Sequence, residues 1–359
     1  MRYSLKLVST TVLGLLELVS AACSANNSSN WLNLAPIPSP RQEQGTVAIN
    51  NDTIAIVGGI VLDGNTTNTV MTDLLQLYDI PSNTWKTVTP VPYAVNHPNV
   101  AAVDGKLYLL GGLVMGRTIS GISVNWVASG DCRVYDASKD TWTELSPMPN
   151  GTERGSAIVG VHGEMIYLAG GMTILQDTYQ DTADTVTAFN TTSGEWQRLP
   201  AAAAVLPEGR QHGTGAVIGN TFYVVGGRWF GQTDTRDTVY ELDLTDLEAG
   251  WQTSKGHMAV ARGGLNGGAI GNRFYAFGGE GSPDSTTGVF NQSEVFDTES
   301  QQWTELGTMP VPRHGTQAAA VGGRVYIPGG GLQQDGKLVY VNGVMSFMQP
   351  TAHFDAFCP

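Results

Sequence analysis

The chain has 359 residues, 41% of them hydrophobic and 14% charged, so it is long enough to bury a large core. Acidic residues outnumber basic ones by 32 to 19, which gives a formal net charge of −13 at pH 7. A protein that binds nucleic acids or anionic membranes needs a basic face. We therefore expect neither a nucleic acid nor a membrane as partner.

The first 22 residues have the three parts of a secretory signal peptide. Arg2 and Lys6 form a basic start, Val8–Val19 an apolar centre, and Ser20-Ala21-Ala22 a cleavage site of small residues. The apolar run is too short for a membrane span, which takes about 20 residues. We therefore predict a signal peptide over residues 1–22 and a secreted protein.

The sequence also contains acceptor motifs for N-glycosylation, several of them at expected turns. They begin at Asn26, Asn27, Asn51, Asn65, Asn150, Asn190 and Asn291. Together with the signal peptide, they predict a glycoprotein of a eukaryotic secretory route.

A repeat of about fifty residues dominates the rest of the chain. Six β-type runs end in a glycine pair: Gly58-Gly59, Gly111-Gly112, Gly170-Gly171, Gly226-Gly227, Gly278-Gly279 and Gly329-Gly330. Six tryptophans keep nearly the same spacing: Trp31, Trp85, Trp142, Trp196, Trp251 and Trp303. Four of them follow an aromatic by seven residues, as Trp85 follows Tyr78.

This pattern resembles that of Kelch repeats, which form β-propellers with four strands per blade. The resemblance covers Trp31 to Asp355 and implies an all-β, six-bladed propeller with antiparallel blades in a single domain, residues 23–359, with almost no helix. Phe354-Asp355 repeats the aromatic-Asp mark, but the chain ends before its Trp. We therefore expect the strand around Trp31 to complete the last blade and close the ring.

The three cysteines fit this closure. Cys23 and Cys358 flank strands that should be neighbours, which predicts a Cys23–Cys358 disulfide in an oxidising compartment. The alternative is that Cys23 leaves with the signal peptide. Cys132 begins an expected strand, and we expect it to be a buried apolar thiol rather than a nucleophile.

In Kelch propellers the loops after the glycine pairs and the entries to the inner strands share one face, called the loop face here, where ligands usually bind. Several of these loops begin with apolar residues, which is typical of a small-molecule pocket. The expected walls of that pocket are Met115, Trp126, Met172, Trp229 and Phe230. Alternatively, these side chains pack on their own loops as small satellite cores.

Arginine recurs at the entries to the inner strands. The positions are Arg41, Arg154, Arg210, Arg262 and Arg313, and the second unit has only His97 in that region. An arginine repeated at one register favours a scaffold role, bonding to backbone of the next blade, over a role in holding a ligand. Because they are not repeated in every unit, His212 and His314 are the better catalytic candidates, with Arg228 as a further donor.

No cofactor or metal ion is expected. Galactose oxidase shares this kind of propeller, but its copper and Cys–Tyr crosslink have no matching context around Cys132. Iron-dependent specifier proteins of plants carry Glu-x-x-x-Asp-x-x-x-His, and this chain has Glu280 and Asp284 but Gly288 in the third place. Two carboxylates alone make a weak transition-metal site.

In size, secretion and loop character the chain resembles propellers of fungal natural-product pathways, including a group of hetero-Diels–Alderases. That group joins an ortho-quinone methide to a terpene in an intermolecular reaction. The resemblance implies a monomer that acts on an apolar, partly oxygenated small molecule by cyclisation or cycloaddition without a cofactor, by orientation and by hydrogen-bond donors to a developing oxyanion. Two alternatives remain open. One is a carbohydrate-binding or mutarotase-like propeller that uses Arg210, Arg262 and Arg313. The other is an extracellular protein-interaction module.

Overall fold

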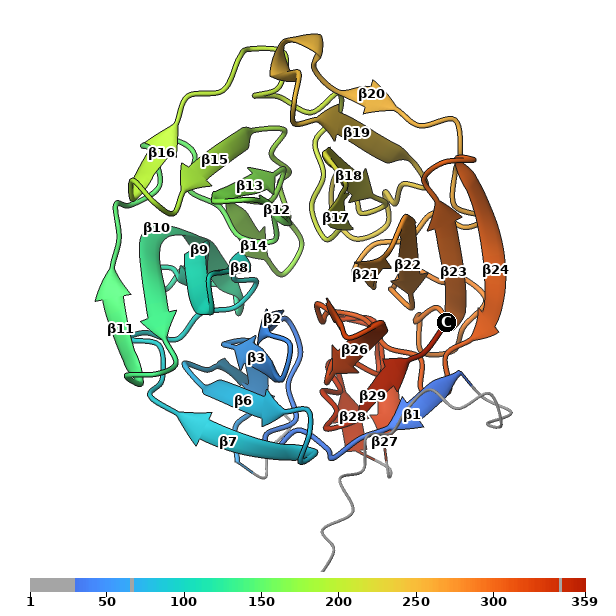
Figure 1. Cartoon of the computed structure of the whole chain (residues 1–359). Coiled ribbons are helices and arrows are strands. Elements are labelled where there is room, and N and C mark those ends of the chain that lie inside the picture. The colour runs from blue at the N-terminus through green and yellow to red at the C-terminus, as the bar shows by residue number, and fades with distance from the viewer. Residues whose placement is uncertain (1–29, 65–67, 342–343) are drawn as a thin grey trace, which may run out of the picture.

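The computed structural model describes residues 30–64, 68–341 and 344–359, and these form six β-sheets arranged around one axis (Figure 1). The described helical content is a single turn of 3₁₀-helix, η1 (Leu247–Ala249). The predicted all-β, six-bladed propeller is confirmed, as is the near absence of helix.

Each blade has four antiparallel strands, from the axis outward. The first blade consists of β2 (Gly45–Asn50), β3 (Thr53–Val57), β6 (Leu75–Asp79) and β7 (Thr84–Val88), and the second of β8 (Val100–Val103), β9 (Lys106–Met115), β10 (Asn125–Asp136) and β11 (Thr141–Glu144). The third consists of β12 (Ile158–His162), β13 (Met165–Ala169), β15 (Val186–Asn190) and β16 (Glu195–Gln197), and the fourth of β17 (Thr214–Ile218), β18 (Thr221–Val225), β19 (Val239–Asp243) and β20 (Gln252–Thr253). The fifth consists of β21 (Asn266–Ile270), β22 (Arg273–Phe277), β23 (Gln292–Asp297) and β24 (Gln302–Thr308), and the sixth of β25 (Ala319–Val321), β26 (Arg324–Pro328), β29 (Phe354–Phe357) and β1 (Trp31–Asn33).

The remaining strands belong to loops on the loop face: β4 (Ile60–Leu62) with β5 (Thr69–Met71), β14 (Ile174–Gln176), and β27 (Val339–Val341) with β28 (Val344–Ser346). In the second blade the strands do not stop at the glycine pair as predicted. β9 and β10 continue past it, and β14 of the third blade adds to β10, with a bulge between Ser129 and Cys132. The bulge lets the extended hairpin bend toward its neighbour.

Ring closure follows the prediction, but with a shifted register. β1 pairs with β29, so the first described strand completes the last blade (Figure 1). Trp31 lies opposite Phe357 instead of Phe354, and Phe357 occupies the strand position that Tyr78 has in the first blade. Asp355 is therefore no part of an aromatic-Asp mark; it stands where Gln76 stands, facing the recurring arginine.

The apolar core is divided among the six joints between blades. Ala55 and Leu107 share one such cluster, for example, and Tyr167 and Phe222 share another. The outer-strand tryptophans contribute at these joints. The indole N–H of Trp85, for instance, donates to the backbone oxygen of Ala35 across the joint.

The glycine pairs bring adjacent blades into backbone contact. Gly170 has φ 66°, and a Cβ there would collide with the carbonyl oxygen of Arg210 in the next blade. Its neighbour Gly171 donates its N–H to that same oxygen. The repeated glycines are thus required by both backbone conformation and close approach.

The recurring arginines are buried scaffold residues, but their side chains bond within their own blade instead of the next one. Each reaches the same position on the third strand of its blade: Arg41 to Gln76, Arg154 to Thr187, Arg210 to Tyr240, Arg262 to Glu294 and Arg313 to Asp355. The contact with the neighbouring blade is made by the arginine backbone oxygen, as described above for Arg210. In the second blade, Val95 occupies the position that the arginine has in the other blades.

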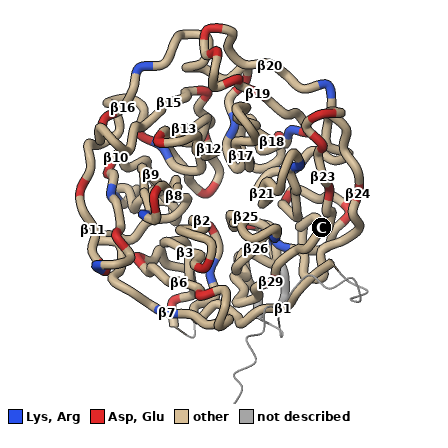
Figure 2. The backbone as a smooth tube through the Cα atoms, in the orientation of Figure 1, with Lys and Arg blue, Asp and Glu red and all other residues tan. Residues whose placement is uncertain are grey.

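Lys and Arg are scattered over the blades and do not gather in one sector (Figure 2). Within the described residues, no helix is long and apolar enough to span a bilayer.

Cys132 is a buried free thiol, and burial raises its pKa to about 12, in line with a structural role. Cys358 is buried at the end of β29, but Cys23 lies outside the described residues, so their disulfide stays a prediction.

The signal peptide and three of the acceptor asparagines, Asn26, Asn27 and Asn65, also lie outside the described residues. Asn51, Asn150 and Asn291 are exposed, whereas Asn190 is half-buried and its amide donates to Glu164. Glycosylation therefore stays a prediction.

Candidate site on the propeller axis

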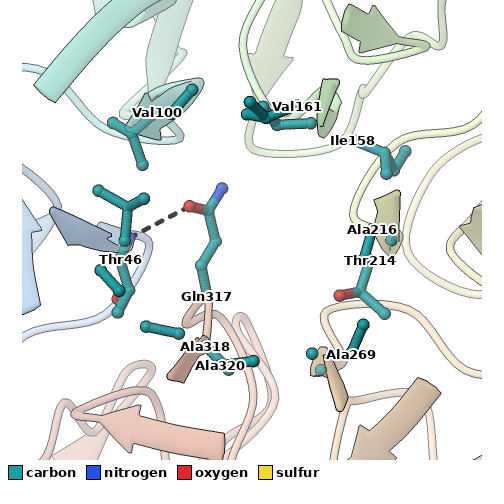
Figure 3. Close-up of a pocket in the computed structure, with 18 of the residues that line it drawn as sticks. Thr46, Val100, Ile158, Val161, Thr214, Ala216, Ala269, Gln317, Ala318 and Ala320 are labelled. Atoms are coloured by element: carbon teal, nitrogen blue, oxygen red, sulfur yellow. Dashed lines mark hydrogen bonds between the residues drawn. The ribbon is translucent and has the colours of Figure 1, made fainter. Parts of the chain in front are cut away.

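A cavity of about 330 Å³ runs along the axis between the six inner strands. Most of the side chains that line it are small and apolar, since six strands crowd the axis, and Val100, Ile158 and Val161 are among them (Figure 3). Polar and apolar atoms contribute about equally to its exposed surface. Thr46, Thr214 and Gln317 supply its polar side chains. A concave site lined by many apolar side chains and a few polar ones is the usual form of a small-molecule site.

Gln317 is the polar side chain that reaches farthest into this cavity (Figure 3). Its amide oxygen accepts a hydrogen bond from the backbone N–H of Thr46 at 3.1 Å. This contact fixes the amide plane, and the amide nitrogen points into the open centre. Gln317 is therefore placed to donate to an oxygen of a bound molecule.

At the loop-face end, the cavity meets a ring of six residues, one from each blade, all with φ between 48° and 62°. They are Glu43, His97, Ser156, His212, Gly264 and Gly315. Each N–H donates to the preceding member of the ring, five times to its carbonyl oxygen and once, from His212, to the hydroxyl of Ser156. The left-handed conformation costs a non-glycine residue free energy, and such positions concentrate at functional sites.

Three of these ring residues bring ionisable side chains together beside a second cavity of about 50 Å³. The Nε2 of His97 lies 2.9 Å from Nε2 of His212 and 3.1 Å from the Glu43 carboxylate. All three residues are at most 8% exposed. Gly315 makes room for Glu43, because a Cβ at position 315 would overlap its carboxylate.

The electrostatics of this cluster hold Glu43 ionised and His212 neutral. Burial alone would raise the pKa of Glu43, but attraction to His97 and His314 overrides it and lowers that pKa. The pKa of His212 is lowered well below its ordinary value, first by burial and then by the nearby charges of Arg228 and the other histidines.

A second layer of residues lies on the loop-face side of the ring. Here Arg228 pairs with Glu280, and Nδ1 of His314 lies 3.4 Å from the Glu280 carboxylate. Burial disfavours a charge on His314, but the carboxylates of Glu280, Asp335 and Glu43 raise its pKa. Arg228, Glu280 and His314 are each at most 1% exposed, so they shape the field of the cluster without lining the axial cavity.

The loop between β26 and β29 covers this end of the axis. Asp335 accepts hydrogen bonds from the Gln42 side chain of the first blade, and its backbone oxygen accepts one from Gln232 of the fourth. The backbone oxygen of Gln333 accepts the Nε2 proton of His314. Burial raises the pKa of the Asp335 carboxyl to about 7.

The predicted pocket walls separate into two groups. Trp126 and Met172 pack with Ile60, Leu113 and Leu175 in a satellite core. Met115, Trp229 and Phe230 are exposed on the rim, where the Phe230 ring contacts Trp229 and Tyr179. The five residues thus do not line one cavity, and none of them faces the axial cavity.

Of the predicted catalytic residues, His212 lies in the ring cluster, while Arg228 and His314 lie in the layer beyond it. Sequence reasoning missed Glu43 and His97 as partners of His212. Both occupy the same place in the repeat as His212, two residues after the arginine or its valine substitute. A polar side chain at this position in several repeats was the signal available.

These observations define a class: a six-bladed propeller with a small-molecule-sized axial cavity that ends at a buried Glu–His cluster. The chain belongs to the Kelch-repeat family, since residues 17–227 and 212–353 match the family described as the KLHDC2/KLHL20/DRC7 Kelch-repeats domain.

Among characterised relatives, the chain is 35% identical to Kelch-like protein terF of Aspergillus terreus, over 97% of this chain and 75% of that protein. It is 28% identical to Kelch-like protein 40 of Xenopus laevis over 61% of this chain, but only 32% of that protein. It is 25% identical to Kelch domain-containing protein 3 of Bos taurus, over 67% of this chain and 64% of that protein.

Proposed function

We propose that this chain binds an apolar, partly oxygenated small molecule in the axial cavity and cyclises it, as an enzyme of fungal secondary metabolism. The observation that carries the proposal is the cavity of about 330 Å³ that ends at Glu43, His97 and His212. The similarity to a fungal Kelch protein over nearly the whole chain supports the biological setting.

The cavity size favours a reaction of one molecule over the joining of two. Ligand sites typically measure about 300–1,000 Å³, so this one is near the lower limit. The sequence led us to expect an intermolecular hetero-Diels–Alder reaction, but an intramolecular ring closure fits this volume better. Apolar walls would hold the chain of the reactant folded, which lowers the entropic part of the barrier.

Polar groups of the axial site support this proposal. The amide nitrogen of Gln317 faces the cavity. The His97–Glu43 pair lies at the loop-face end of the cavity. Hydrogen-bond donors of this kind stabilise a carbonyl or phenolate oxygen that becomes more negative in the transition state.

The carbohydrate alternative has less support. Arg210, Arg262 and Arg313 are at most 1% exposed, and their guanidinium groups are occupied within their own blades. They are not placed to hold the carboxylate of a sugar acid. The protein-interaction alternative rests on the exposed rim aromatics alone.

Secretion, glycosylation and the ring-closing disulfide belong to the same proposal. Secretion and glycosylation are supported by the basic and apolar segments of residues 1–22, and by exposed acceptor asparagines such as Asn150.

The test is turnover of a panel of alkenyl-substituted hydroxybenzyl alcohols, which are precursors of ortho-quinone methides. We expect cyclised product above the uncatalysed rate, measured by chromatography, and a loss of at least tenfold in Thr214→Leu, which fills the cavity. Thr304→Leu on the exposed face of β24 is the matched control and should behave as wild type. Equal rates in Thr214→Leu and wild type would exclude the axial cavity as the site.

A further inference from the structure

The ring cluster has the geometry of a metal site. Nε2 of His97, Nε2 of His212 and a carboxylate oxygen of Glu43 lie within 4.8 Å of one another. Their separations are 2.9 Å between the two nitrogens, 3.1 Å from His97 to Glu43 and 4.0 Å from His212 to Glu43. With metal–ligand bonds of about 2.0–2.2 Å, neighbouring ligand atoms on one ion lie roughly 3–3.5 Å apart, so only small shifts are needed.

Both imidazole rings are held with Nε2 toward the axis. Nδ1 of His97 contacts the side-chain oxygen of Asn96, and Nδ1 of His212 contacts that of Gln211. The amide of Gln211 is itself oriented, because its nitrogen donates to Gln180 and to the backbone oxygen of Gly231. Its oxygen therefore accepts the Nδ1 proton of His212.

This orientation leaves the Nε2 lone pair of His212 directed at Nε2 of His97 and at Glu43. Such an arrangement needs a positive charge or a proton at its centre, because three acceptors that face one another repel. A bond from the distal ring nitrogen to an oxygen is also the usual support of a metal-binding histidine.

We propose that Glu43, His97 and His212 bind one first-row divalent metal ion, for which Zn²⁺ is the reference. Two histidines and one glutamate form a known ligand set for catalytic zinc, which leaves at least one coordination position open. The adjoining cavity of about 50 Å³, lined by the same three residues, has room for a water molecule in that position.

The surrounding charges accommodate a cation. Arg228 places a positive charge near His212, and its partner Glu280 offsets part of that charge. Nδ1 of His314 lies 4.0 Å from the other oxygen of Glu43 and leaves the oxygen near the histidines free to bind. Asp335 lies 3.9 Å from His314 and supplies a further negative charge when ionised.

This inference goes beyond the proposed function, and it runs against the expectation of a metal-free protein. The metal site could not be recognised in the sequence, because its three ligands come from three different blades, at positions 43, 97 and 212. A bound ion would lie at the loop-face end of the axial cavity. There an oxygen of a molecule bound in the cavity could occupy the open coordination position of the ion.

The experiment uses the full chain after removal of metals with a chelator. Zn²⁺ is titrated by calorimetry, and Co²⁺ by the visible absorption that reports a nitrogen- and oxygen-bound ion. We expect one ion per chain. Glu43→Gln, His97→Gln and His212→Gln should each weaken binding by more than about 100-fold, and Gln211→Leu, which removes only the support of His212, by about 10- to 100-fold.

His162→Gln is the matched control, since His162 lies on the third blade at the turn end of β12, bonded to Asn220. It should bind Zn²⁺ as wild type does. Circular dichroism checks that each variant folds, and a rise in melting temperature on adding Zn²⁺ to wild type gives a reading that needs no variant.

Absence of stoichiometric binding by the stripped wild-type chain would overturn the proposal. Binding that persists in His97→Gln and His212→Gln, or that is lost equally in His162→Gln, would also overturn it. None of these readings requires a substrate, so a failure of the proposed cyclisation leaves them unaffected.

Discussion

The two halves of the loop face use one backbone frame for opposite purposes. The residue after the glycine pair is Ile60, Leu113 or Met172 in the first three blades, and each is fully buried in or beside the satellite core around Trp126. The same position is Arg228 in the fourth blade and Glu280 in the fifth, and these two form a buried ion pair. One half thus fastens the loops by apolar packing, whereas the other sets the electrostatic field over the axial site.

We expect the largest loss of stability from a substitution in the half of the loop face that contains the Arg228–Glu280 ion pair. Arg228→Met removes the closer partner of the buried Glu280 carboxylate and leaves it His314 at 3.4 Å, and we expect a loss of up to about 3–5 kcal/mol in the free energy of unfolding. The double variant Arg228→Met/Glu280→Leu makes this half resemble the other and should recover most of that loss. Urea denaturation checks both. A double variant as unstable as the single one would show that the pair is more than a packing element.

The apolar half should respond to lost volume alone. Met172→Ala removes a fully buried side chain, for which we expect a cost of about 2–5 kcal/mol. Met115→Ala is a matched control, because Met115 is 63% exposed, and its cost should stay within about 0.5 kcal/mol. A similar cost for both in urea denaturation would contradict the division between satellite core and rim.

The apolar blades also contain the buried thiol of Cys132, which gives a pH-dependent test. Its pKa is raised by burial from 9.0 to about 12, so the folded state holds the proton more tightly than the unfolded state does. This contribution to stability is complete below pH 9 and is lost between pH 9 and 12, at about 1.4 kcal/mol per pH unit.

Cys132→Ala lacks this term, so its unfolding free energy should fall less steeply with pH than that of wild type in this range. Parallel curves for the two proteins would contradict it. In native wild type, the thiol should also resist alkylation at pH 8 and react only after unfolding.

The smallest effect is expected at the exposed rim. Trp229 is 45% exposed and stacks under Arg236 at 5.8 Å. Trp229→Ser should change stability by no more than about 0.5 kcal/mol and should leave turnover in the axial cavity unchanged. A loss of turnover in this variant would move the site back to the loop face.

The architecture was predictable because its determinants are local and repeated. Gly58-Gly59 and its counterparts mark where backbone must approach backbone, and Trp85 and its counterparts mark the outer strands. One closure detail was misjudged: Phe354-Asp355 imitates the aromatic-Asp mark, but Phe357 is the residue that faces Trp31.

The site was less predictable, because its residues meet only when the ring closes. His212 was identified as a candidate, but its partners Glu43 and His97 come from other blades. The apolar loop starts suggested a pocket, yet Met172 is buried in a satellite core, which only its neighbours in space reveal. The axial cavity is formed by residues that are small in every repeat and therefore do not stand out individually.

The pairing of β1 with β29 has a consequence for biosynthesis. Of the described strands, β1 comes first along the chain and can pair only after β29, the last of them, has left the ribosome. Until then β1 has no partner strand, and the sixth sheet lacks its outer strand. A variant without β1 or without β29 would lose this pairing and leave the sixth blade incomplete where it meets the first.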